Sequence, residues 1–376
     1  MSTARLSHVL RIGLSIAFAA LFAEFPRHSA IAAETRPASH AITNEPLFFS
    51  GDSKTAATAN LLRAPSQAPH LTSADGAIVF EAGRDFVWQP GSRALTLTVD
   101  SHIPFKTTAE LHPPANSPNA YRHQRGSEAW MFFGPGRVMH DLQCLADYSS
   151  DEEWQAPPVV TAPDSQLGAL RARLRSRQPV RFVMLGDSIS TGADASAISG
   201  VAPLQPGYPD LVARGLEQRF GGKVALTNLS VSGMDSNWGL TRMEDVIADK
   251  PDLVLIAFGM NDASGRRSPE EFSRITREMA ASVRTALPEC AVLLVSSMTA
   301  NSEWVHAAPD LYPKYADALA KLAGPGIAFA NATERWTAIE GRKKHMDLSG
   351  NGLNHPNDYG HRLYAEVILS VIGRPL

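Results

Sequence analysis

The chain has 376 residues, of which 44% are hydrophobic and 19% charged, and its formal net charge is −3. This balance is that of a globular protein and excludes a disordered or fibrous chain, while the length favours two domains. Since the sequence has no lysine-rich block, it offers no electrostatic footprint for nucleic-acid binding. Its two cysteines, Cys144 and Cys290, lack the spacing of a metal site. A single disulfide and two buried free thiols both stay open.

The N-terminus has the layout of a targeting segment. Arg5 and Arg11 precede the apolar run 12–22, IGLSIAFAALF, and the small residues of SAIAA follow. This order predicts a secretory signal peptide over residues 1–33, with an uncleaved anchor as the alternative. No later segment is long and apolar enough to cross a membrane. We therefore expect a secreted or periplasmic protein with no stable membrane insertion after signal cleavage.

The next part of the chain divides into a loose segment and a β-rich module. Residues 34–76 are rich in Ala, Ser, Thr and Pro without clear periodicity, which predicts a linker or loosely ordered segment. Short apolar or alternating runs then end at glycine or aspartate: AIVFEAG, DFVWQPG, ALTLTVD and AWMFFGPG. They predict a β-rich accessory module over residues 77–155. The acidic and then proline-rich stretch 151–165 forms its boundary.

From residue 164 onward, helical and strand patterns alternate. Leucines recur at helical spacing in SQLGALRARLRSR. Strands rich in Val, Ile and Leu are predicted at 179–185, 223–231, 252–258, 290–298 and 326–331. Helices are predicted near 208–220, 239–249, 269–287, 309–323 and 358–372. This alternation indicates an α/β domain over residues 164–376, in which helices cover both faces of a parallel sheet.

Polar residues follow three of these strands, at the point where each strand ends. They are Gly186, Asp187 and Ser188, then Ser232 and Gly233, then Gly259, Asn261 and Asp262. Ligands of parallel sheets bind at the carboxyl ends of the strands. Each cluster alone is also what an ordinary turn or helix cap contains. Their joint placement at one edge predicts a functional site.

A serine hydroxyl needs a base to become a nucleophile, so a histidine must reach the same edge. The best placed of the 12 histidines is His355 in NGLNHPNDYGH. Pro356 follows it and fixes the loop just before the final helix. His361 is the competitor but falls inside that helix, and His345 has no comparable anchor. A loop histidine without a role is the alternative interpretation.

The segments GDSIS, SVSGMDS, GMND and NHPNDYGH, in this order and on these strands, resemble the four blocks of the SGNH-hydrolase superfamily, the GDSL-type esterases and lipases. The resemblance covers about residues 178–376 and implies a three-layer α/β/α, flavodoxin-like domain. It implies Ser188 as nucleophile and His355 as base. It also implies an oxyanion hole formed by the N–H groups of Ser188 and Gly233 and the side-chain amide of Asn261. No metal and no cofactor are expected.

One position departs from the family pattern. The aspartate that usually stands three residues before the histidine is replaced here by Gly352, and Asn351 precedes it. We predict Asp347 as the acid that orients the imidazole, and we expect Asp358 to cap the final helix. The alternative is a Ser–His dyad whose ring is held by Asn351 or a backbone carbonyl. Without an orienting carboxylate, turnover can fall by several orders of magnitude.

These features predict a secreted serine esterase that acts on small-molecule or polysaccharide esters through an acyl-enzyme on Ser188. By analogy, we expect short acyl groups such as acetyl, carried on carbohydrate. Trp238 and Trp304 could form sugar-stacking walls or simply pack in loops. The alternatives are a lipase, lysophospholipase or thioesterase, an O-acyltransferase, and a catalytically weak carbohydrate-binding homologue. No amphipathic lid rich in Leu and Phe is evident, and the sequence leaves the oligomeric state open.

Overall fold

The computed structural model describes residues 40–374, so the predicted signal peptide, residues 1–33, lies outside the described residues. Contacts between Cα atoms group residues 38–376 into one unit. The domain boundary predicted between residues 155 and 164 stays a prediction. No helix within residues 40–374 has both the length and the apolar character needed to cross a membrane.

The C-terminal part is built on a five-stranded parallel sheet with the strand order β12-β11-β13-β14-β15. All five strands were predicted, and they are β11 Val180–Gly186, β12 Val224–Asn228, β13 Leu253–Ala257, β14 Ala291–Val295 and β15 Ile327–Ala330. Every residue of β13 and β14 is buried. Strands of this kind read as continuous Val, Ile and Leu runs because neither of their faces meets water. The prediction of an α/β domain with a parallel sheet is confirmed.

The helices follow the predicted alternation, except that one predicted helix is divided in two and four helices were missed. The predicted helices are α3 Asp164–Arg175, α5 Tyr208–Phe220, α9 Pro269–Ala286, α10 Leu311–Ala320 and α13 Asp358–Ile372. The region predicted as one helix at 239–249 forms two, α6 Ser236–Leu240 and α7 Met243–Ala248. The prediction missed α4 Ser196–Ser199, α8 Met260–Ser264, α11 Ala332–Glu340 and α12 His345–Leu348. Five of these six elements have six residues or fewer, which is too short for a repeating helical pattern to show in the sequence.

The N-terminal part is an antiparallel β-rich module, as predicted. Its main sheet has the order β4-β3-β10-β1-β2-β6-β5, with β7 paired to β1. The strands are β1 His40–Gly51, β2 Thr58–Asn60, β3 His70–Ser73, β4 Val79–Phe80, β5 Phe86–Trp88, β6 Ala94–Leu97, β7 Phe105–Thr107 and β10 Gln143–Ser150. A separate hairpin joins β8 Ala120–Arg122 to β9 Trp130–Phe132. Three short helices complete it: η1 Lys54–Ala56, α1 Thr108–Leu111 and α2 Arg137–His140.

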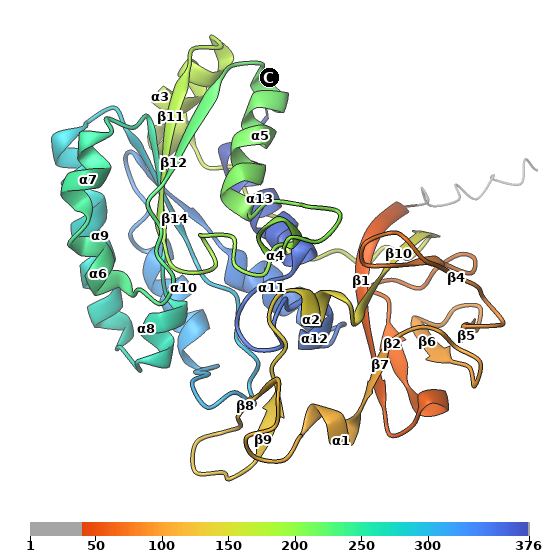
Figure 1. The fold of residues 1–376 in the computed structure, drawn as a ribbon. Coiled ribbons are helices and arrows are strands. Elements are labelled where there is room, and N and C mark those ends of the chain that lie inside the picture. Colours follow the sequence, from red (N-terminus) through yellow and green to blue (C-terminus); the bar gives the residue numbers. More distant parts are fainter. Residues whose placement is uncertain (1–39, 375–376) are drawn as a thin grey trace, which may run out of the picture. The chain divides into compact units, whose positions relative to one another are not determined.

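Residues 40–73 correct the prediction of a loosely ordered segment over 34–76. They contain β1, which pairs with β10, β2 and β7, as Figure 1 shows in red. The buried carboxylate of Glu45 on β1 lies 2.7 Å from the Lys343 ammonium and accepts a hydrogen bond from the Tyr148 hydroxyl at 2.6 Å. These partners lie about 100 and 300 residues away. A local reading of composition misses a strand that is held by such distant contacts.

The core and the cysteines fit this arrangement. The antiparallel sheet has its own buried cluster, around Leu47, Phe49 and Phe86, apart from the large cluster around the parallel sheet. Cys144 and Cys290 are both buried and unpaired, so free thiols are the correct alternative. Burial raises the pKa of both thiols, which makes them unreactive.

Candidate active site

The first strand of the parallel sheet ends in a turn that presents Ser188. A Cβ atom at Gly186 would lie 2.6 Å from the Ala257 carbonyl oxygen on the neighbouring strand, so only glycine fits there. Asp187 follows, and its carboxylate accepts a hydrogen bond from the Ile189 N–H at 3.0 Å. Burial raises the pKa of Asp187 to about 7. Asp187 therefore organises the turn that presents Ser188.

Ser188, His355 and Asp194 form a continuous hydrogen-bonded chain. His355 Nε2 lies 2.9 Å from Ser188 Oγ, and its Nδ1 lies 2.7 Å from Asp194 Oδ2. The other oxygen of Asp194 accepts a hydrogen bond from the Gly136 N–H at 2.6 Å, which fixes the carboxylate. This is the arrangement in which an imidazole takes a proton from serine while a carboxylate stabilises the imidazolium.

Asp347, the predicted partner of His355, is elsewhere, and that prediction is wrong. Its carboxylate accepts hydrogen bonds from the N–H of Phe48 on β1 at 2.6 Å and from the N–H of Lys344 at 2.9 Å. The Lys343 ammonium lies 4.0 Å away. These contacts bury Asp347 completely and tie α12 to β1. The alternative of a Ser–His dyad also fails, because Asp194 contacts the ring.

Asp194 left only a weak signal in the sequence. It lies six residues after Ser188 but 161 residues before His355, whereas the search for an acid covered the neighbourhood of the histidine. Its φ of +61° follows Gly192 at +86°, a left-handed turn that aspartate tolerates better than most residues. The only cue was an aspartate in the glycine-containing turn GAD just after the nucleophile.

The loop before His355 explains why glycine stands where the family usually has aspartate. Gly352 has a φ of +86°, and a Cβ atom there would approach the Phe132 carbonyl oxygen to 3.2 Å. Asn351 does not hold the imidazole. Its side-chain oxygen instead accepts hydrogen bonds from the N–H groups of Leu353 and His355, at 2.8 and 3.3 Å. These bonds shape the loop that presents the ring.

The start of the final helix corrects the expected role of Asp358 and agrees with the expected place of His361. Asn357, and not Asp358, caps α13, accepting a hydrogen bond from the Gly360 N–H at 3.1 Å. Asp358 accepts one from the Ser196 N–H at 2.8 Å. His361 is completely buried in α13, with Nε2 3.2 Å from the Ala193 carbonyl oxygen. Burial lowers the pKa of His361 to about 4, so this ring stays neutral and supports the turn next to Asp194.

The three predicted oxyanion donors lie at the ends of neighbouring strands. Within residues 40–374, neither the N–H of Ser188 nor that of Gly233 has a hydrogen-bond acceptor. Gly233 has a φ of +81° and open space around its Cβ position. Glycine is therefore favoured there by the backbone conformation and not by a lack of room. One hydrogen of the Asn261 amide is donated to the Met234 carbonyl at 2.8 Å, which leaves the second available.

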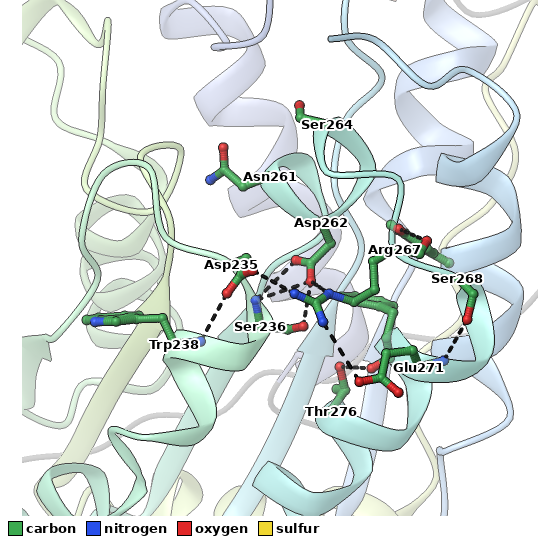
Figure 2. A network of polar contacts seen from close by, with 12 residues as sticks. Asp235, Ser236, Trp238, Asn261, Asp262, Ser264, Arg267, Ser268, Glu271 and Thr276 are labelled. Carbon is green, nitrogen blue, oxygen red and sulfur yellow. Dashed lines mark hydrogen bonds and ion pairs between the residues drawn. The ribbon is translucent and has the colours of Figure 1, made fainter.

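A polar network holds the Gly233 turn and the Asn261 helix together. Asp262 accepts hydrogen bonds from the Ser236 hydroxyl at 2.5 Å and from Arg267 Nε at 2.7 Å. The same guanidinium reaches Asp235 at 2.6 Å. In Figure 2, the side chain of Asn261 points away from this network, while Asp262 points into it. Asp262 therefore anchors the short helix α8, and Asn261 projects from it.

The two tryptophans have different surroundings. Trp238 packs edge-on against Phe258, with ring centroids 6.5 Å apart, and is half-buried. Trp304 belongs to an aromatic group with Tyr121 and His306, at centroid distances of 6.3 and 5.2 Å. Both tryptophans are half-buried and pack against the same core cluster, but only Trp304 is part of a group of several aromatic rings.

The region that contains these site residues matches a known protein family. Residues 184–363 match the model of the GDSL-like Lipase/Acylhydrolase family, which spans β11 to α13 and includes Ser188, Gly233, Asn261 and His355. The resemblance seen in the four sequence blocks is confirmed, as is the prediction of a carboxylic ester hydrolase of the GDSL type. No curated protein matches the chain.

Several solved structures are similar to the GDSL-like region. A catalytic variant of Axe2, an acetylxylan esterase from Geobacillus stearothermophilus, is 20% identical with a TM-score of 0.44, over 52% of this chain and 95% of that one. A two-domain esterase (CEX) active on acetylated mannans is 25% identical with a TM-score of 0.46, over 57% of this chain. This chain covers 54% of that esterase, about half its length.

Proposed function

We propose that the chain is a serine esterase that forms an acyl-enzyme on Ser188. The observation that carries the proposal is the Ser188–His355–Asp194 chain, with contacts of 2.9 and 2.7 Å. His355 Nε2 removes the hydroxyl proton as Ser188 Oγ attacks the ester carbonyl, and the imidazolium then gives that proton to the departing alcohol. Water attacks the acyl-enzyme by the reverse route and releases the acid.

Three donors support the oxyanion that forms in each half of this reaction. The N–H groups of Ser188 and Gly233 and the second hydrogen of the Asn261 amide come from three adjacent strand ends. Donors fixed before the reaction stabilise the transition state without reorganisation. The Asp262–Arg267 network serves this purpose indirectly, since it fixes the positions of two of the donors.

We further propose that the acyl group is short, such as acetyl, and that a carbohydrate hydroxyl carries it. The support is the aromatic group at Trp304, whose loop contacts the loop of His355. Asn301 in that loop donates hydrogen bonds to the carbonyls of Leu353 at 2.7 Å and Gly352 at 3.0 Å. Flat amphipathic rings suit a sugar face. Acetylated xylan and mannan are also named as substrates of two similar structures. Secretion or periplasmic location is proposed from residues 1–33 alone.

Esters of graded acyl length, together with acetylated xylan, test this function. The Ser188→Ala variant should lose at least about 1000-fold in kcat on the best ester, because the acyl-enzyme cannot form. Ser264→Ala is the matched control, since the Ser264 hydroxyl donates only to the Met260 carbonyl at 3.1 Å. Undiminished hydrolysis by Ser188→Ala would disprove the mechanism. Activity that rises with acyl length would disprove the short-acyl proposal and favour a lipase.

A further inference from the structure

Three side chains that the ester site does not use come together in another part of the molecule. His112 directly follows α1, His123 follows β8, and Glu303 lies in the loop between β14 and α10. One ligand atom from each lies within 4.8 Å of the other two, the one group of at least three such ligands among residues 40–374. Glu303 Oε2 lies 3.3 Å from His112 Nε2 and 3.8 Å from His123 Nε2.

The hydrogen bonds of His112 leave its Nε2 facing a carboxylate oxygen. Its Nδ1 lies 3.1 Å from the Thr108 carbonyl oxygen, which can only accept, so Nδ1 carries the hydrogen. In the neutral ring, Nε2 then presents a lone pair, and that lone pair faces a carboxylate oxygen of Glu303, which is also an acceptor. A bond from Nδ1 to a carbonyl is the usual way in which a metal-binding histidine is oriented.

His123 turns the same ring nitrogen toward Glu303 from a more buried position. Its side chain is 16% exposed, and its Nδ1 is buried with no hydrogen-bond partner in the described part of the chain. Both imidazoles thus turn Nε2 to the same carboxylate oxygen. Each Nε2 would need its own proton to bond to that oxygen, whereas one divalent cation can bind both Nε2 atoms and the carboxylate at once.

We propose that His112, His123 and Glu303 bind one Zn²⁺ ion. Two imidazoles and one carboxylate are a donor set that zinc takes, whereas Ca²⁺ and Mg²⁺ prefer oxygen ligands. Ligand atoms around tetrahedral zinc lie about 3.3 Å apart, from metal–ligand distances of about 2.0–2.1 Å. The His112–Glu303 pair already has this spacing of 3.3 Å. The side chains of His112 and Glu303 are 41% and 44% exposed, so they can close on His123, and water completes the coordination.

The position of this site gives the ion a structural role. It joins three segments: the end of α1, the β8–β9 hairpin and the loop that carries Glu303. Trp304 is the next residue in that loop, and Asn301 links the loop to Gly352. The ion would brace the loop beside the candidate ester site without taking part in its chemistry. This inference goes beyond the esterase proposal and does not depend on it.

Zinc titration of the full chain tests the proposal. The chain, prepared without a histidine tag, is stripped with a chelator and titrated with Zn²⁺ against a chromogenic chelator. We expect one ion per chain and a rise in Tm at zinc concentrations well above Kd. The double variant His112→Ala/His123→Ala and the single variant Glu303→Gln should each bind at least about 100-fold more weakly, because second-sphere changes alone cost 10–100-fold.

His102→Ala is the matched control, since His102 is also an exposed imidazole beside a carboxylate, 3.1 Å from Asp85, but lacks a second histidine. Its zinc affinity should equal that of the unaltered chain. Equal affinities for the unaltered chain and the double variant would overturn the proposal, as would the absence of stoichiometric binding. Glu303→Gln keeps the size of the side chain, so a loss of affinity with an unchanged metal-free Tm excludes misfolding as its cause.

Discussion

Two carboxylates, Asp194 and Asp347, show how differently two regions of this molecule use the same group. Asp194 lies in the turn after β11, where His355 and a backbone N–H share its two oxygens. Asp347 lies in α12, closer to His355 in sequence, yet it accepts hydrogen bonds from two backbone N–H groups and contacts β1. Closeness along the chain therefore says little about which acid meets a histidine. The turn geometry after the nucleophile decides it.

The largest expected effect separates these two acids. Asp194→Asn should lower kcat by about 10,000-fold, because the amide favours the wrong imidazole tautomer and cannot stabilise the imidazolium. The fold should be little changed, since the amide oxygen can still accept from the Gly136 N–H. Steady-state kinetics on a short ester, with Tm as the check on folding, measures this. A loss of less than tenfold would show that Asp194 does not orient His355.

The parts of the fold that were predicted are those that local sequence determines. The parts that were missed depend on residues far away in the chain or on an unusual turn. The strands of the parallel sheet were predictable because burial on both faces forces continuous Val, Ile and Leu runs. Ser188, Gly233, Asn261 and His355 were found because each follows a strand or precedes a helix. Strand β1 was missed because Glu45, inside it, is satisfied by Lys343 from the far end of the chain. Asp194 was missed because its role depends on a left-handed turn.

The proposed oxyanion donors at the other strand ends can be tested in the same way, by substitution of Asn261. Asn261→Ala removes the free amide hydrogen while leaving the Asp262–Arg267 network in place, because the two neighbouring side chains point in different directions (Figure 2). We expect kcat to fall by about 100- to 1000-fold with a smaller change in KM. Initial rates over a range of ester concentrations separate the two constants. An unchanged kcat would remove Asn261 from the proposed oxyanion hole.

The carboxyl group of Asp187, next to the nucleophile, should make the free energy of unfolding depend on pH. Burial raises the pKa of Asp187 to about 7 from 3.8, so the folded state favours its protonated form. The resulting stability is present below about pH 4 and is lost as pH rises toward 7, by up to about 4 kcal/mol at 1.36 kcal/mol per unit.

Asp187→Asn mimics the protonated form, so its free energy of unfolding should exceed that of the unaltered chain increasingly from pH 4 to 7. Urea unfolding of both chains at several pH values measures this difference. His361, whose pKa is lowered to about 4, is present in both chains and cancels. A difference that stays constant with pH would show that the charge of Asp187 is not its cause.

Substitution of Asp347 should lower stability but not kcat, in contrast to substitution of Asp194. In Asp347→Asn, the amide accepts on one side only, so the N–H of Phe48 or of Lys344 loses its acceptor. An unsatisfied buried N–H costs about 1–3 kcal/mol of the free energy of unfolding. Burial raises the pKa of Asp347, so removal of the charge itself should offset part of this loss. Urea unfolding measures the stability, and kcat of the folded variant should change by less than about threefold. A loss of kcat as large as that of Asp194→Asn would mean that both acids serve His355, and the contrast between the two regions would fail.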